Sequence, residues 1–383
     1  MKSGFILIPI ILIAVILRFW LLGNVPTGVT HDEMGYIYNA YSIAKTGRNV
    51  FGEFLPVFTW MTKSGFPFMP VPVYSMVPLF WFLPLTAFTG RLLPAILGVA
   101  DVVLLYFIVL NLFRHPALAL VSALFLAISP WQIHFARSAY DANYALFYFL
   151  AATAAFVSAI RKKKLSRAVI PAFLLAVFSY RGMSVILVPL GVAFLWYARI
   201  TRALSLRQGV IFLAGIGISV LLFASPIFVY GNTFVAEGTQ LFKNAKIQED
   251  VDASIREAQG PLAVRRFFAN KPTYIIDRFR ENYIKTYSPE FLFLYTEPSA
   301  IYSIWSRGRL YFIDVFFIIA GIAYLYRIRK QAAILWYGLL LIGGLPGGIG
   351  GMPYSARNLF LAAVFPVFSA AGVLFAVGSP RHK

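Results

Sequence analysis

Residues 5–33 read FILIPIILIAVILRFWLLGNVPTGVTHDE, and this stretch joins an apolar run to an acidic pair. The run at 5–22 carries no acidic side chain and is close to the length of about 20 residues that a transmembrane helix needs. Only Lys2 precedes the run as a charged residue, and no small-residue cleavage site follows it. We therefore expect a retained anchor rather than a cleaved signal, with Asp32-Glu33 emerging at the far membrane surface.

The composition extends this membrane character to the whole chain. Hydrophobic residues make up 60% of the 383 residues, charged residues only 13%, and the mean hydropathy is +0.74. Soluble domains carry about 25% charged residues, so the chain is predicted to be an integral membrane protein. Cysteine is absent, which excludes disulfides and thiolate metal sites, and the scattered histidines argue against a histidine metal cluster.

The net charge of +19 comes from basic clusters that lie between apolar runs. No acidic residue interrupts these clusters, which are Arg114; Arg161 to Lys164 with Arg167; Arg199, Arg202 and Arg207; Arg327, Arg329 and Lys330; and Arg381 with Lys383. This is the positive-inside pattern, which orients short loops toward the cytoplasm. The charge is therefore a topology signal with anionic headgroups as its partners, and we expect no nucleic-acid binding.

Apolar periodicity predicts an all-α fold, a polytopic transmembrane bundle of about ten spans. The spans are 5–22, 91–113, 116–133, 142–160, 168–180, 182–198, 209–229, 310–326, 332–348 and 357–378. Both termini then lie in the cytoplasm, together with every basic cluster. The proline-rich stretch 72–88 is predicted to be a juxtamembrane helix on the outer face, because a further crossing would place residues 161–167 outside.

Three regions follow from these spans. Residues 1–230 form a membrane module that includes the outer loop 23–90, residues 231–309 form a large extracytoplasmic loop, and residues 310–383 form the C-terminal spans. Chemistry is therefore expected at the membrane, on the extracytoplasmic face.

The acidic pair opens the first outer loop with a helix signature. Thr30 and Glu33 have the spacing of a capping box. One interpretation is therefore that the two acids merely start a surface helix, where the helix dipole favours negative charge. The same arrangement leaves the Asp32 carboxylate unused by the cap, with Tyr36 one turn further on the same face. An ionised carboxylate beside an aromatic hydroxyl can also hold and deprotonate a hydroxyl acceptor. Both interpretations stay open here.

Basic and polar residues at the predicted outer edge are candidates for substrate contacts. The candidates for a phosphate are Arg91, Arg137, Arg181, Arg357 and Lys63, and those for other substrate groups are Tyr36, His134, Asp141 and Tyr180. Arginine suits phosphate because its planar fork donates two parallel hydrogen bonds. Each arginine can instead extend to the interface, and Asp141 can pair with Arg137 four residues earlier.

The order of these features resembles the C-type glycosyltransferase superfamily. The chain is most similar to the group of protein O-mannosyltransferases and lipid A aminoarabinose transferases. The resemblance rests on a first span followed by Asp32-Glu33-x-x-Tyr36; Thr46-Gly47-Arg48-Asn49-Val50-Phe51-Gly52; a helix from Pro72-Val73-Tyr74; Arg91-Leu92-Leu93-Pro94; Ser129-Pro130 with Arg137 and Asp141; and Arg357-Asn358-Leu359 before Pro366.

The resemblance implies a sugar donor on a polyprenyl phosphate and an acceptor hydroxyl on a glycan, a lipid or a protein. Asp32 would act as the base with Glu33 and Tyr36 beside it, and the transfer would invert the sugar. Arg137 and Arg357 are the first candidates for the leaving phosphate. No metal is required, although Asp32 with Asp141 could hold a divalent ion. The Lys-Pro pair of many relatives is missing, and Lys63 lies upstream of its place.

Two other functions fit the same composition. A flippase or transporter for lipid-linked sugars would also need many spans and intramembrane charge such as Asp101, but transporters commonly have repeated halves, and the sequence has no internal repeat. A non-catalytic subunit of a membrane assembly would keep the fold and bury Asp32 in a pair without a cavity beside it.

Overall fold

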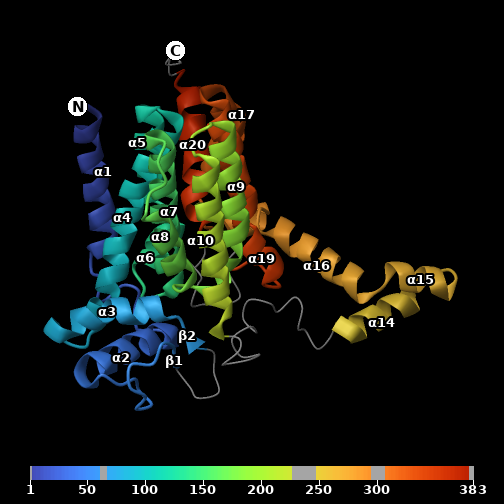
Figure 1. Cartoon of the computed structure of the whole chain (residues 1–383), viewed down its shortest axis with the longest axis horizontal. Helices are drawn as coiled ribbons and strands as arrows, with labels where there is room; N and C mark the ends of the chain where they lie inside the picture. Colours follow the sequence, from blue (N-terminus) through green and yellow to red (C-terminus); the bar gives the residue numbers. More distant parts are fainter. Residues whose placement is uncertain (1, 61–66, 227–246, 295–306, 379–383) are drawn as a thin grey trace.

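The computed structural model describes residues 2–60, 67–226, 247–294 and 307–378, and these residues are mostly helical, with one two-stranded sheet. Figure 1 shows a bundle with two helices across one end and a helical arm at its side. The elements of the first half are α1 (Lys2–Phe19), α2 (His31–Thr46), β1 (Thr59–Trp60), β2 (Pro67–Phe68), α3 (Pro70–Phe82), α4 (Ala87–Phe113), α5 (Pro116–Ala127), α6 (Pro130–Ala136) and α7 (Asp141–Lys162).

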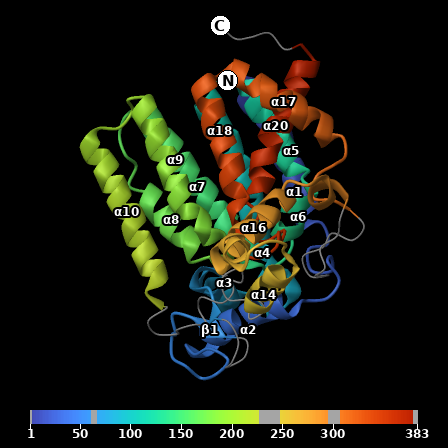
Figure 2. The same cartoon turned by 90° about the vertical axis from the view of Figure 1, so that its right-hand side faces the viewer.

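The second half completes the bundle and forms the arm. Its elements are α8 (Val169–Val177), η1 (Arg181–Ile186), α9 (Leu187–Ile200), α10 (Leu206–Ala224), α14 (Ile247–Glu257), α15 (Leu262–Phe268), α16 (Lys271–Lys285), η2 (Glu290–Leu294), α17 (Asp314–Ile328), α18 (Lys330–Gly343), α19 (Leu345–Ile349) and α20 (Leu361–Ala376). Figure 2 shows α7 to α10 on one side of the bundle and α17, α18 and α20 on the other.

The basic turns meet at one end of the bundle. Arg161, in the last turn of α7, donates from Nη1 to Asn111 Oδ1 near the end of α4, at 2.6 Å. Arg329, between α17 and α18, donates to the carbonyl of Leu112 at 2.5 Å. In Figure 1, α1 begins and α20 ends at this end, whereas α2 and α3 lie across the opposite end. The sequence pattern of basic clusters therefore corresponds to one end of the molecule.

The predicted count of about ten spans is not supported. Within the described residues, five helices are long and apolar enough to cross a membrane, or six if the bent pair of α5 and α6 is one span. They are α4, α7, the run Arg181–Ile200, α10 and the run Lys330–Ile349. The sequence count overlooked helix breaks, since α5 and α6 meet at 58° and α8 has only 9 residues. The structure is nonetheless a multi-pass helical bundle of apolar helices, as composition predicts.

Two glycines let α17 and α20 approach closely. A Cβ atom built on Gly321 would lie 1.9 Å from the carbonyl oxygen of Phe368, and one on Gly372 would lie 2.0 Å from that of Phe317. These distances are far below van der Waals contact, so the two backbones touch where the glycines face them. Small residues allow this close approach in membrane helix pairs.

Candidate functional site

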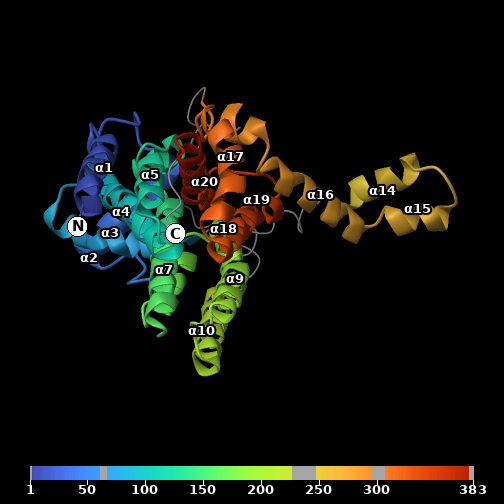
Figure 3. The ribbon, with the colours of Figure 1, turned by 90° about the horizontal axis from the view of Figure 1, so that it is seen from above.

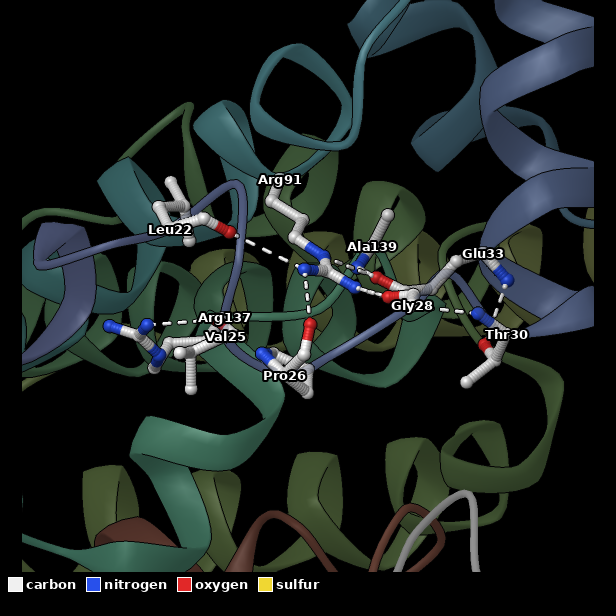
Figure 4. Close-up of polar contacts among 9 residues, drawn as sticks. All are labelled: Leu22, Val25, Pro26, Gly28, Thr30, Glu33, Arg91, Arg137 and Ala139. Carbon is white, nitrogen blue, oxygen red and sulfur yellow. Dashed lines mark hydrogen bonds and ion pairs between the residues drawn. The ribbon is translucent and has the colours of Figure 1, made fainter.

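Glu33 is the buried centre of the contacts at the α2 end of the bundle (Figure 4). The predicted capping box forms, because Glu33 N donates to Thr30 Oγ1 at 3.3 Å and Thr30 N donates to Glu33 Oε2 at 3.1 Å. The same carboxylate accepts from Arg91 Nε at 3.0 Å, from Arg91 Nη2 at 3.1 Å and from Ala139 N at 2.9 Å. Glu33 thus joins the start of α2 to α4 and to the turn before α7.

Arg91 uses its whole guanidinium in the same network. Beyond Glu33, it donates to the carbonyls of Leu22 at 3.4 Å, Pro26 at 2.9 Å and Gly28 at 2.6 Å. These bonds together occupy all five N–H groups of an arginine. Arg91 is fully buried, so the geometry gives it the role of fixing the 22–28 loop, in contrast to the phosphate contact expected from sequence.

Arg137 ties the second outer turn to the end of α1. Its guanidinium donates to the carbonyls of Leu17 at 2.9 Å, Trp20 at 2.7 Å and Val25 at 2.8 Å. Burial first, and then the positive charge of Arg91, lower the pKa of Arg137. Much of the donor capacity of Arg137 is therefore directed at backbone carbonyls.

Asp32 is the accessible member of the acidic pair. Its side chain is 28% exposed, whereas that of Glu33 is 0% exposed. Asp32 Oδ1 lies 3.1 Å from His31 Nε2 in the first turn of α2, where the helix dipole favours negative charge. Of the two carboxylates, only that of Asp32 is therefore open to solvent.

Predicted substrate residues gather around this turn. Tyr36 donates its hydroxyl proton to Asp141 Oδ2 at 2.7 Å, which joins α2 to the start of α7. The ring of His134 lies 6.4 Å from that of Tyr140, centre to centre. Burial raises the pKa of the Tyr140 hydroxyl, which hydrogen-bonds to Thr30. The structure therefore brings Asp32, Tyr36, His134 and Asp141 to one end of the bundle.

Arg181 is linked to the α2 end of the bundle through β2, which pairs antiparallel with β1. Arg181 Nη2 donates to the carbonyl of Pro67 at 2.8 Å, and the next residue, Phe68, packs its ring 4.4 Å from that of Tyr36. Tyr180 folds over Gly182, where a Cβ atom would lie 2.6 Å from the tyrosine hydroxyl oxygen. Lys63, the other predicted phosphate ligand, lies outside the described residues.

Arg357 belongs to a second group of buried cations, beside α6. It donates to the carbonyl of Gly350 at 2.6 Å and lies 4.8 Å from the ring centre of Tyr354. Arg309 donates from Nε to Ser355 Oγ at 2.6 Å, and Trp131 Nε1 donates to the carbonyl of Ser355 at 3.1 Å.

Sequence reasoning missed His31, Tyr140 and Arg309. The position of His31 next to Asp32 was a usable signal, and Tyr140 directly precedes the predicted residue Asp141. Arg309 had no such signal, because its position beside Ser355 depends on how α17 docks against the bundle.

The suggested metal pair lacks a set of ligands among the described residues. No group of three or more His, Cys, Asp or Glu side chains that could hold a metal ion occurs in the described part of the chain. Asp141 accepts the Tyr36 hydroxyl with one oxygen, and Asp32 lies beside His31. Oxygen-ligand metal sites gather several oxygens around one ion, more than these two carboxylates alone supply, so a divalent ion at Asp32 and Asp141 stays a prediction.

Comparison with known proteins shows similarity in structure only. The sequence matches no protein-family model and no curated protein. The solved structure of the oligosaccharyltransferase AglB from Archaeoglobus fulgidus, with an inhibitory peptide and a dolichol-phosphate, is 16% identical with a TM-score of 0.60. It covers 98% of this chain and 50% of AglB. The Archaeoglobus fulgidus oligosaccharyltransferase with a tethered acceptor peptide is 17% identical with a TM-score of 0.59. That match covers 98% of this chain and 50% of the oligosaccharyltransferase.

A third structure, ArnT from Cupriavidus metallidurans bound to undecaprenyl phosphate, is 12% identical with a TM-score of 0.44. The match covers 97% of this chain and 78% of ArnT. The fold assignment rests on AglB, and the chain spans about half the length of that protein. The C-type superfamily and the subgroup within it stay predictions. Nearly the whole chain shares its fold with about half of the archaeal oligosaccharyltransferase.

Proposed function

We propose that the protein is a membrane glycosyltransferase that moves a sugar from a polyprenyl-phosphate donor to an acceptor hydroxyl. The observation that carries this proposal is the division of the acidic pair, with Glu33 buried in the Arg91 network and Asp32 exposed beside it. The fold shared with AglB, which was solved with a dolichol-phosphate, supports a lipid-linked donor. The acceptor can be a glycan, a lipid or a protein.

In this reaction Asp32 acts as general base. The acceptor oxygen attacks the anomeric carbon as Asp32 removes the hydroxyl proton, and the bond from that carbon to the phosphate oxygen breaks. The polyprenyl phosphate leaves with the bonding electrons, and the anomeric configuration inverts. Tyr36 and Asp141 border the acceptor position, and Glu33 positions Asp32 through the start of α2.

The leaving phosphate needs a positive counter-charge, because the departing oxygen gains negative charge. We assign this role first to Arg357 and Arg181, with Lys63 in reserve. Arg137 contributes charge at the site, but its bonds to three carbonyls make positioning its main task. Arg91 is fully committed to Glu33 and the 22–28 loop, so it acts as a positioning residue.

The orientation follows from the charged ends of the bundle. The end that carries Arg114, Arg161 and Arg329 lies in the cytoplasm by the positive-inside rule. The opposite end, with α2, α3 and Asp32, is then extracytoplasmic, and the termini are cytoplasmic (Figure 1).

Release of polyprenyl phosphate by the purified full chain tests the proposal. The protein in lipid nanodiscs is supplied with a panel of polyprenyl-phosphate sugars and with glycan, lipid and peptide acceptors. Glycosylated acceptor with equimolar polyprenyl phosphate from at least one pair is the expected result. A folded protein that binds the lipids but releases no phosphate from any donor would contradict it. Movement of the intact donor across vesicles would then favour a flippase.

A further inference from the structure

The arm of α14, α15 and α16 has an apolar surface that the bundle does not cover. On α15 the exposed side chains Leu262, Val264, Phe267 and Phe268 form what we call the arm patch. The two phenylalanine residues are 72% and 69% exposed, although such rings are usually buried. Contiguous exposed apolar side chains of this kind mark an interaction surface.

The charges of the arm differ between α14 and α15, whereas α16 carries both signs. Acidic residues dominate α14, which carries Glu249, Asp250, Asp252 and Glu257. The α15 helix carries only basic charge, from Arg265 and Arg266, and Lys271 begins the next helix. Arg266 and Lys271 are exposed, whereas Arg265 donates to the carbonyl of Ile255 at 2.9 Å. The apolar surface and the accessible basic charge therefore occur together on and next to α15, whereas α14 carries an excess of acidic residues.

The arm extends sideways from the bundle. It begins where α16 packs against α19, and Figure 3 shows it reaching well beyond the outline of the bundle. In Figure 1 it lies toward the α2 and α3 end, with α15 above α14, on the side of the spanning helices. A bilayer around the spans would therefore lie on the α15 side of the arm. The outer surface of the spans is itself apolar, with Leu213, Ile218 and Leu221 of α10 exposed.

We propose that the arm patch inserts into the headgroup region of the leaflet on the α2 and α3 side. Amphipathic segments with aromatic residues and adjacent basic residues bind at this depth. Phe267 and Phe268 would enter the boundary with the acyl chains, while Arg266 and Lys271 contact lipid phosphates. The acidic α14 remains in water, away from anionic headgroups that would repel its negative charge.

This membrane contact is independent of the proposed reaction. It requires only that the spans lie in a bilayer and that the arm keeps its sideways direction. Its consequence is mechanical, because an anchored patch holds α16 and thereby α19 at a fixed depth. The partner is a phospholipid surface, continuous with the lipid that surrounds α10, rather than a second protein.

The absence of cysteine makes a direct depth measurement straightforward. A polarity-sensitive fluorophore is attached to the single cysteine of two full-chain variants, Phe267→Cys and Phe268→Cys. Each nanodisc of phosphatidylethanolamine and phosphatidylglycerol holds one protein chain. Ser254→Cys on exposed α14 is the aqueous control, and Leu213→Cys on α10 is the lipid-facing reference. Lipids with a nitroxide near the headgroup serve as quenchers.

We expect blue-shifted, strongly quenched emission at 267 and 268, and neither effect at 254. Adding Arg266→Glu to the Phe267→Cys protein should weaken the quenching severalfold in discs that contain phosphatidylglycerol. Emission at 267 and 268 that matches 254 would overturn the proposal. A blue shift without nitroxide quenching would overturn it as well, because protein rather than lipid would then cover the patch.

Discussion

At the scale of residues, adjacent acids perform separate tasks because the start of α2 faces two environments. Glu33 points into the bundle, where its carboxylate accepts from Arg91, Thr30 and Ala139. Asp32 precedes it by one position and faces outward beside His31. Sequence reasoning predicted the capping box and the exposed role of Asp32, but not the Arg91 pair. That pair joins residues 58 positions apart, and helix periodicity carries no information about such a contact.

Glu33→Gln should destabilise the protein strongly. The substitution keeps the shape of the side chain but leaves Arg91 buried without a counter-charge, and breaking a buried pair in this way costs about 3–5 kcal/mol. The free energy of unfolding, measured by denaturant titration in detergent micelles, should fall by that amount. Glu257→Gln is the matched control at an exposed position, where we expect a change below about 0.5 kcal/mol. Equal stability of the two variants would contradict the role of Glu33.

At the scale of elements, helix type was predictable from composition, whereas helix breaks were not. The spans at 91–113 and 142–160 agree closely with α4 and α7. The predicted span 168–180 contains only the short α8, and 116–133 crosses the bend between α5 and α6. Apolar content is uniform through these breaks, so a hydropathy pattern does not register them. Packing against neighbouring helices decides where the chain bends.

The α17 and α20 contact offers a test at this scale. Gly321→Ala places a methyl group against the Phe368 carbonyl, so the helices must separate, and overpacking of this kind costs about 1–3 kcal/mol. Gly217→Ala is the control, because nothing lies within 4 Å of a Cβ atom at that position on α10. There the gain in helix propensity should stabilise the protein by about 0.5–1 kcal/mol. Melting temperatures that move in the same direction for both variants would contradict the close packing.

At the scale of the whole molecule, the charge pattern specified which turns share an end. The bonds of Arg161 to Asn111 and Arg329 to Leu112 bring three of the predicted cytoplasmic turns together. Residues 1–230, 231–309 and 310–383 remain predicted regions, and the structure gives the middle one an arm. The direction of that arm depends on the docking of α16 on α19, which no local sequence feature specifies.

Membrane orientation can be measured with single cysteines in the cysteine-free chain. Glu53→Cys lies in the first outer loop and Lys164→Cys in the basic turn after α7, and both positions are exposed. An impermeant maleimide added to intact cells should label position 53 only, and position 164 should react after the membrane is opened. Wild-type protein controls for labelling elsewhere. Labelling of 164 alone in intact cells would place the Asp32 end in the cytoplasm.

The most direct test of the account is donor turnover by Asp32→Asn. Asn keeps the shape of Asp32 and cannot accept the acceptor proton, and loss of a general base typically lowers the rate about 10²–10⁴-fold. Initial rates of polyprenyl phosphate release are compared for wild type and Asp32→Asn in nanodiscs, with unfolding curves and donor binding as controls. We predict native stability, unchanged donor binding and a rate reduced at least a hundredfold. Wild-type release by folded Asp32→Asn would show that Asp32 is not the base.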